Sequence, residues 1–185
     1  MKFFIVSIDY FTKWIKAKPL ATITTQQVQQ FVWKDIICRY GIPHTIITDN
    51  GRIFIDKELT RFYTDLGIKH ITSSIEHPQT NGQAEAANKV ILIKLRKHLD
   101  GVKGRWPEDL LKVLRAYRCI PQSATNEPPF SLVYSAEAMI PVEIDKPSLR
   151  YQVYDPNQNQ HNLCIHLDLL TELREKAQIR NIAVK

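Results

Sequence analysis

Residues 45–51 read Thr-Ile-Ile-Thr-Asp-Asn-Gly, a short apolar run that ends in an acid and a turn sequence. A run of this length suits a strand of a sheet, and Asn-Gly is a turn signal. Open α/β sheets bind ligands beyond the carboxyl ends of their strands, which favours a functional interpretation of Asp49. The alternative is that Asp49 only forms the turn.

Strands and helices are expected to alternate along the chain around this run. Short apolar runs predict strands, and apolar residues at helical spacing predict helices. The expected strands lie at residues 3–8, 14–18, 45–48 and 68–71, the second ended by Pro19, and the expected helices at 25–40, 59–66, 83–95 and 107–117. This alternation predicts an α/β fold, with a mixed sheet flanked by helices.

The composition changes near residue 141. Residues 147–160 hold two prolines and many amides, which is typical of a linker. A helical stripe follows, made of Leu163, Leu167, Leu170, Leu173 and Ala177. We therefore divide the chain into a core at residues 1–144, a linker at 145–160 and a C-terminal helical extension at 161–185. The stripe packs either on the core or on another protomer.

Charge and hydropathy narrow the class of protein. The chain has 25 basic and 19 acidic residues, a net charge of +6 that permits binding to a polyanion. No apolar run reaches the roughly 18 residues that a membrane span needs, and the N-terminus does not resemble a signal peptide. We expect no membrane partner and an intracellular protein, nuclear or cytoplasmic and not secreted.

The cysteines and nearby histidines predict no metal site of the zinc type. Cys38, Cys119 and Cys164 are odd in number and far apart, so they favour neither a disulfide framework nor a CxxC site. His161, Cys164 and His166 have uneven spacing that fits a helix surface. No zinc is expected in this chain.

Three acids lie where the fold could bring catalytic side chains close to one another. Asp9 and Asp49 follow predicted strands, and Glu85 lies in the first turn of a predicted helix. Clustered carboxylates repel one another unless divalent cations lie between them, an arrangement that phosphoryl transfer uses. Each acid alone has a plainer interpretation, since Asp forms turns and an acid in a first helical turn stabilises the helix dipole.

A longer pattern around Asp49 and Glu85 resembles a known family. The string TDNG at 48–51 is followed, after 35 intervening residues (50 through 84), by Glu85 within HPQTNGQAEAANK at 77–89. This resembles the integrase core of retroviruses and long-terminal-repeat retrotransposons, nearest the plant gypsy-type elements. The likeness extends over residues 3–144, through DYFTKW at 9–14, GIP at 41–43, Trp106, AYR at 116–118 and PFSLVY at 129–134.

The resemblance implies a ribonuclease-H-like fold and metal-dependent DNA integration by 3′ processing and strand transfer. Asp49 and Glu85 would be catalytic acids that bind Mg²⁺ or Mn²⁺. Asn88 and Lys89 would contact DNA, as would His77 and Gln79 in an active-site loop. A plain surface lysine and a plain loop histidine are the alternatives for Lys89 and His77. The implied partners are DNA of the element ends and target, and further copies in a homo-oligomer.

One departure from the family concerns the third acid. In the family the first catalytic Asp lies on an earlier, central strand in a W-x-x-D-x-x-G-P context, whereas DYFTKW belongs to the second strand. This sequence begins at that second strand, so we expect the first catalytic strand to be missing and Asp9 to point away from Asp49. Asp9 is kept as the alternative third acid.

The incomplete set of acids leaves two functional hypotheses. In the first, the chain is an integrase catalytic domain that is inactive as given, because the first catalytic Asp is absent. In the second, it is a non-catalytic remnant of an integrase that binds nucleic acid or supports assembly.

Overall fold

The computed structural model describes residues 3–73, 82–98, 106–136, 138 and 154–183. The chain forms two compact units. The first unit comprises Met1–Ile8 and Ile15–Leu114, and the second comprises Asp9–Trp14 and Arg115–Lys185. The turn between the first two strands therefore belongs to a different unit from the strands themselves.

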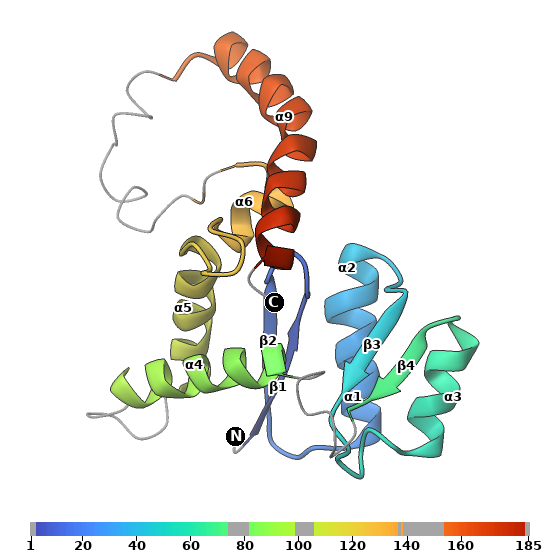
Figure 1. Ribbon diagram of the computed structural model, residues 1–185. Helices are drawn as coiled ribbons and strands as arrows, with labels where there is room; N and C mark the ends of the chain where they lie inside the picture. Colours follow the sequence, from blue (N-terminus) through green and yellow to red (C-terminus); the bar gives the residue numbers. More distant parts are fainter. Residues whose placement is uncertain (1–2, 74–81, 99–105, 137, 139–153, 184–185) are drawn as a thin grey trace. The chain divides into compact units, whose positions relative to one another are not determined.

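Strands and helices alternate through the first unit, as the sequence predicts (Figure 1). Its elements are β1 (Phe3–Ile8), β2 (Ile15–Leu20), α1 (Thr25–Phe31), the π-helix η1 (Val32–Ile37), α2 (Cys38–Tyr40), β3 (Thr45–Thr48), α3 (Lys57–Asp65), β4 (Lys69–Thr72), α4 (Gly82–His98) and α5 (Trp106–Cys119). The last turn of α5 belongs to the second unit, which also holds α6 (Pro129–Tyr134) and α9 (Pro156–Ala183).

The strands form two small sheets. β1 and β2 pair antiparallel, from Phe3 opposite Leu20 to Ile8 opposite Ile15. β3 and β4 pair parallel, from Thr45 opposite Lys69 to Thr48 opposite Thr72. The expected α/β fold is confirmed, but no strand within the described ranges joins β1 to β3. This gap lies where the family resemblance expects the central strand.

Two details of the predicted elements are wrong. Pro19 does not end the second strand: it lies inside β2, opposite Phe4. A proline lacks a backbone donor, and an edge strand tolerates that loss on its unpaired side. The helix at 25–40 is not α-helical throughout, because Val32–Ile37 is π-helical. Wider π-helical turns are rare, and apolar spacing alone does not reveal them.

One buried cluster holds the first unit together. Its members come from α1, η1, α3 and the segment before β4: Val28, Phe31, Val32, Leu59, Tyr63 and Ile68. Ile5 from β1 and Ile46 from β3 both pack against this cluster. The two sheets therefore share one apolar core without sharing backbone hydrogen bonds. Apolar burial is non-directional, so it can hold both sheets on the same helices.

The second unit is built around Trp14 and α9. The Trp14 ring lies 5.4 Å from the Tyr134 ring, centroid to centroid, and the Arg118 guanidinium lies 4.5 Å from the centre of the Trp14 ring. Helix α6, which contains Tyr134, was not predicted. It is a single short segment that begins with prolines, so it offers little periodicity to detect.

The C-terminal helix begins earlier than the predicted extension. α9 starts at Pro156, inside the segment predicted as a linker, while residues 139–153 lie outside the described residues. Of the predicted leucine stripe, Ala177 is buried but Leu163 and Leu167 are exposed. None of the helices within the described ranges is long and apolar enough to cross a membrane. The division into core, linker and extension stays a prediction.

The shared core gives a prediction about stability. Leu59 of α3 is fully buried, whereas Leu111 of α5 is 68% exposed. We expect Leu59→Ala to lower the free energy of unfolding by roughly 2–5 kcal/mol, because it removes apolar contacts and leaves a cavity. The matched change Leu111→Ala should alter it by less than about 0.5 kcal/mol. Urea unfolding followed by circular dichroism measures both, and equal losses would contradict the assigned core.

Candidate functional site

Asp49 follows β3 directly, and its carboxylate is held by the turn that comes next. The backbone N–H of Gly51 donates to Asp49 Oδ1 at 2.9 Å, an Asx-type contact. A Cβ on residue 51 would lie 2.9 Å from the same oxygen, so a larger residue here would force the Asp49 carboxylate to shift. Asp49 is exposed, and its second oxygen has no hydrogen bond or ion pair with any described residue. The turn thus orients the carboxylate and leaves one oxygen available.

The strand end before Asp49 is fixed by β4. The Thr48 carbonyl accepts from the backbone N–H of Ser73 at 2.8 Å, and the Thr48 hydroxyl lies 2.9 Å from His70 Nε2. The His70 ring is 4.9 Å from the Tyr63 ring, centroid to centroid. Burial lowers the pKa of His70, which favours its neutral imidazole. Burial also raises the pKa of Tyr63 to about 12.

Helix α4 presents Glu85 on its outward face. Ala87, Ile91 and Leu95 are buried, and α4 packs against β1. This buried face leaves Glu85 exposed in the first turn of the helix, without a hydrogen bond or ion pair to any described residue.

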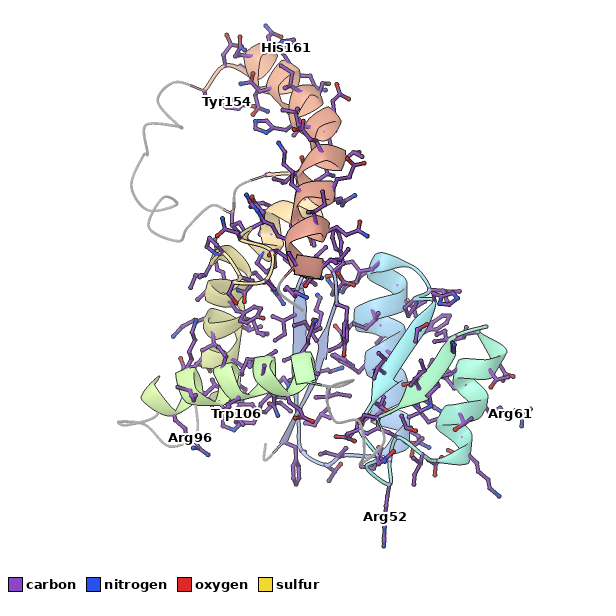
Figure 2. All side chains as sticks on the ribbon, in the orientation of Figure 1. Arg52, Arg61, Arg96, Trp106, Tyr154 and His161 are labelled. Carbon is purple, nitrogen blue, oxygen red and sulfur yellow. The ribbon has the colours of Figure 1, made fainter. Side chains whose placement is uncertain are left out.

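Polar and basic side chains accompany these acids. Asn88 and Lys89, about one turn beyond Glu85, are exposed, and their contact with DNA stays a prediction. Figure 2 shows Arg52 extending outward from the turn after β3 and Arg96 extending outward from α4. Lys89 on α4 and Arg52 after β3 are thus close in sequence to Glu85 and Asp49, and exposed cations of this kind can bind phosphates.

Asp9 forms a turn. Its Oδ2 accepts from the Thr12 backbone N–H at 2.7 Å and from the Thr12 hydroxyl at 2.6 Å. Asp9 belongs to the second unit, whereas Asp49 and Glu85 belong to the first. Within the described ranges, no group of three His, Cys, Asp or Glu side chains is placed to hold a metal ion. A role for Asp9 as the third acid stays a prediction.

The predicted loop residues His77 and Gln79 lie outside the described residues. The contact between Thr48 and His70 was not predicted. This contact depends on the register of the parallel strands β3 and β4, and a single sequence does not give that register. By contrast, Gly51 was already indicated by the turn sequence that follows Asp49.

Comparison with known proteins shows which family the sequence matches. The integrase core domain family matches residues 2–78, which contain Asp49. The Gag-Pol polyprotein of Avian reticuloendotheliosis virus is 30% identical over 133 residues, 72% of this chain and 12% of that protein. Residues 2–78 of this chain belong to the integrase core family. The resemblance to the integrase core that the sequence indicates is confirmed, and the gypsy-type assignment stays a proposal.

A relative from a transposon extends the comparison beyond viruses. The retrovirus-related Pol polyprotein from transposon 412 of Drosophila melanogaster is 27% identical over 135 residues, 73% of the integrase core chain and 11% of that protein. The chain thus spans about a tenth of the length of these two relatives.

Solved structures confirm the fold. The catalytic core domain of HTLV-2 integrase, in complex with magnesium, matches with a TM-score of 0.54 and 24% identity, over 68% of this chain and 79% of that one. The simian T-cell lymphotropic virus intasome, in complex with PP2A regulatory subunit B56 gamma, matches with a TM-score of 0.61 and 21% identity, over 78% and 52%. The integrase core therefore has the ribonuclease-H-like fold that the sequence predicts.

The partly buried position of His70 predicts a pH dependence of stability. Because burial lowers the pKa of His70, the unfolded chain takes up its proton near pH 6.5 and the folded chain only at a lower pH. The contribution of His70 to stability is complete above about pH 6.5 and is lost as the pH falls through the folded pKa. His70→Gln should remove this part of the pH dependence, measured by urea unfolding. An NMR titration that gives His70 a pKa at or above about 6.5 would contradict this account.

Proposed function

We propose that this chain is the catalytic core of a gypsy-type retrotransposon integrase, in which Asp49 and Glu85 are catalytic acids that share one divalent cation. The carrying observation is the pair of exposed carboxylates, one directly after β3 and one in the first turn of α4, neither engaged by described residues apart from the turn contact of Asp49. The reaction would be 3′ processing and strand transfer of DNA.

The donor set fits Mg²⁺ or Mn²⁺. Both ions prefer oxygen ligands such as carboxylates, and Asp49 offers an oxygen that its turn contact leaves available. When bound, the ion supplies charge that stabilises the attacking or leaving oxygen in phosphoryl transfer. The Gly51 N–H holds one oxygen of the Asp49 carboxylate, and the Thr48 contacts fix the end of β3 just before it. The magnesium in the HTLV-2 core supports this choice of ion.

The exposed basic side chains support DNA as the substrate. Lys89, Arg52 and Arg96 are exposed, Lys89 lies about one helical turn from Glu85, and the net charge is +6. Cations of this kind bind phosphates without reading sequence, whereas the amide of Asn88 can reach a base edge or a phosphate. We propose that these side chains hold the DNA backbone next to Glu85. The intasome relative supports an assembly of several copies on DNA.

Two carboxylates are fewer than two-metal catalysis uses. A pair of ions about 3.5–4 Å apart needs a bridging ligand, and the described residues bring no third acid to Asp49 and Glu85. Losing one electrostatic contact to the transition state typically reduces the rate by about 10²–10³. We therefore propose that these 185 residues alone do not perform strand transfer.

The experiment is an oligonucleotide strand-transfer assay with Mn²⁺. We expect no joining by the 185 residues, and joining by the same chain with the family's first strand added before Met1. Glu85→Gln should abolish the activity of the extended chain. Glu58→Gln is the matched control, because Glu58 is also an exposed acid in a first helical turn and should leave joining unchanged. Joining by the unextended chain that disappears with Asp9→Asn would show that Asp9 is catalytic.

The alternative hypothesis, a remnant that binds nucleic acid without catalysis, is tested by measuring binding to the same oligonucleotide. Fluorescence anisotropy that falls steeply with salt, without joining in either chain, would favour a nucleic-acid-binding remnant. In both hypotheses Lys89→Glu should weaken binding more than the control Lys34→Glu on η1, since both lysines are exposed and only Lys89 lies one turn from Glu85.

A further inference from the structure

β1 and β3 each have one edge without a neighbouring strand. Among the strands of the described ranges, β1 pairs only with β2, and β3 pairs only with β4. Both strands belong to the first unit, where Ile5 of β1 and Ile46 of β3 pack against the same buried cluster. The two open edges therefore border one apolar core. Unpaired backbone groups on such an edge can bind another extended chain.

One hydrogen bond shows which residues of β1 face its open edge. The Asp9 N–H, one residue beyond the strand, donates to the Trp14 carbonyl at 2.8 Å. Successive residues of an antiparallel strand direct their backbone groups to opposite edges. Counted back from Asp9, the residues of β1 that face away from β2 are Phe4, Val6 and Ile8. Pro19 agrees with this assignment: it lies opposite Phe4, so the donor that it lacks falls on the outer edge of β2.

Two hydrogen bonds to β4 assign the open edge of β3 in the same way. The Lys69 N–H donates to the His44 carbonyl at 3.0 Å, and the Ser73 N–H donates to the Thr48 carbonyl at 2.8 Å. Residues 44, 46 and 48 therefore face β4. The residues of β3 whose backbone groups face the open edge are Thr45 and Ile47.

The exposure of the two strands is a second, independent observation. β1 is apolar on both faces, and it contacts α4 as well as the shared cluster. Strands of this composition are normally buried between helices. Yet no residue of β1 is buried, and in β3 only Thr48 is. These apolar strands therefore lack cover along their open edges.

We propose that the open edges of β1 and β3, here called the strand slot, bind one extended and largely apolar peptide segment that pairs with both strands at once. Figure 1 shows β1 and β3 running in opposite directions, so a strand between them is antiparallel to one and parallel to the other. Antiparallel pairing is the more stable, and β1 is the longer strand. The segment should therefore run antiparallel to β1. This binding does not depend on the proposed catalytic function.

The strand slot specifies the chemistry of its ligand. The peptide backbone must donate and accept on both sides, which excludes proline inside the segment. Its side chains would lie beside the shared cluster and beside α4, so apolar and β-branched residues fit. β1 has six residues, which sets the useful length of the segment. In this mode of recognition the main-chain hydrogen bonds supply the affinity.

Amide hydrogen exchange of the full chain, followed by NMR, tests the strand slot without a ligand. Val6 and Ile47, which face the open edges, should exchange at least about tenfold faster than Ile5 and Ile46, which face the paired strands. Equal protection of the two sets would mean that the edges are already occupied, and it would overturn the proposal.

The probe for binding is a synthetic peptide, acetyl-Val-Thr-Val-Ile-Val-Thr-Lys-Lys-amide, whose lysines keep it soluble. At about ten times its dissociation constant, the peptide should slow exchange at Val6 and at Ile47 by about tenfold. Slowing at one edge only contradicts the strand slot. So does the absence of slowing at peptide concentrations up to about 1 mM.

Two N-methylated forms of the peptide are the matched ligand controls. Methyl groups on alternate backbone nitrogens remove the donors from one side of the strand, and the two forms differ in which side they block. Each form should bind at least about tenfold more weakly, because the strand slot pairs with both sides. A form that binds as well as the unmethylated peptide would show pairing with a single edge and would contradict the proposal.

A matched pair of variants tests the slot from the side of the protein. Ile47→Lys should weaken peptide binding by about tenfold or more, because the bound peptide would remove water from the new charge. Ile42→Lys should leave binding unchanged, since Ile42 lies before β3 and is 58% exposed. Circular dichroism checks that both variants fold. Equal effects of the two changes would count against the strand slot, and the N-methylated peptides test it on the unchanged chain.

Discussion

The packing of two small sheets on one helical surface is the interaction on which the first unit depends. Ile5 of β1 and Ile46 of β3 meet the same buried cluster around Phe31, while no strand in the described ranges joins the two sheets. Isolated two-stranded sheets are marginal in water, so apolar contacts with α1 and α3 stabilise them. The position of Asp49 at the end of β3 is therefore set by side-chain packing.

A few short hydrogen bonds connect this packing to the candidate site and fix the position of Asp49. The Thr48 hydroxyl and carbonyl contact His70 and Ser73, and Gly51 then donates to Asp49. Glu85 depends on a different support, the buried side of α4 against β1. Asp49 and Glu85 thus belong to the same unit, and carboxylates of this kind are ligands that Mg²⁺ and Mn²⁺ accept.

Much of this could be predicted from the sequence because the signals are local. Apolar spacing located the strands and helices of the first unit, and the 48–51 and 77–89 strings identified the family. The π-helical turn, the passage of β2 through Pro19 and the Thr48–His70 contact could not be predicted, because they depend on strand pairing or on tertiary packing.

The proposed function requires that Asp49 and Glu85 share one cation, and Mn²⁺ tests this sharing in solution. A bound Mn²⁺ broadens the NMR signals of nearby backbone amides. Titration should broaden the amides of Asp49–Gly51 and of Glu85–Asn88 together, and Asp49→Asn should abolish both effects. Broadening confined to one of these segments, or centred on Asp9–Thr12, would contradict the account.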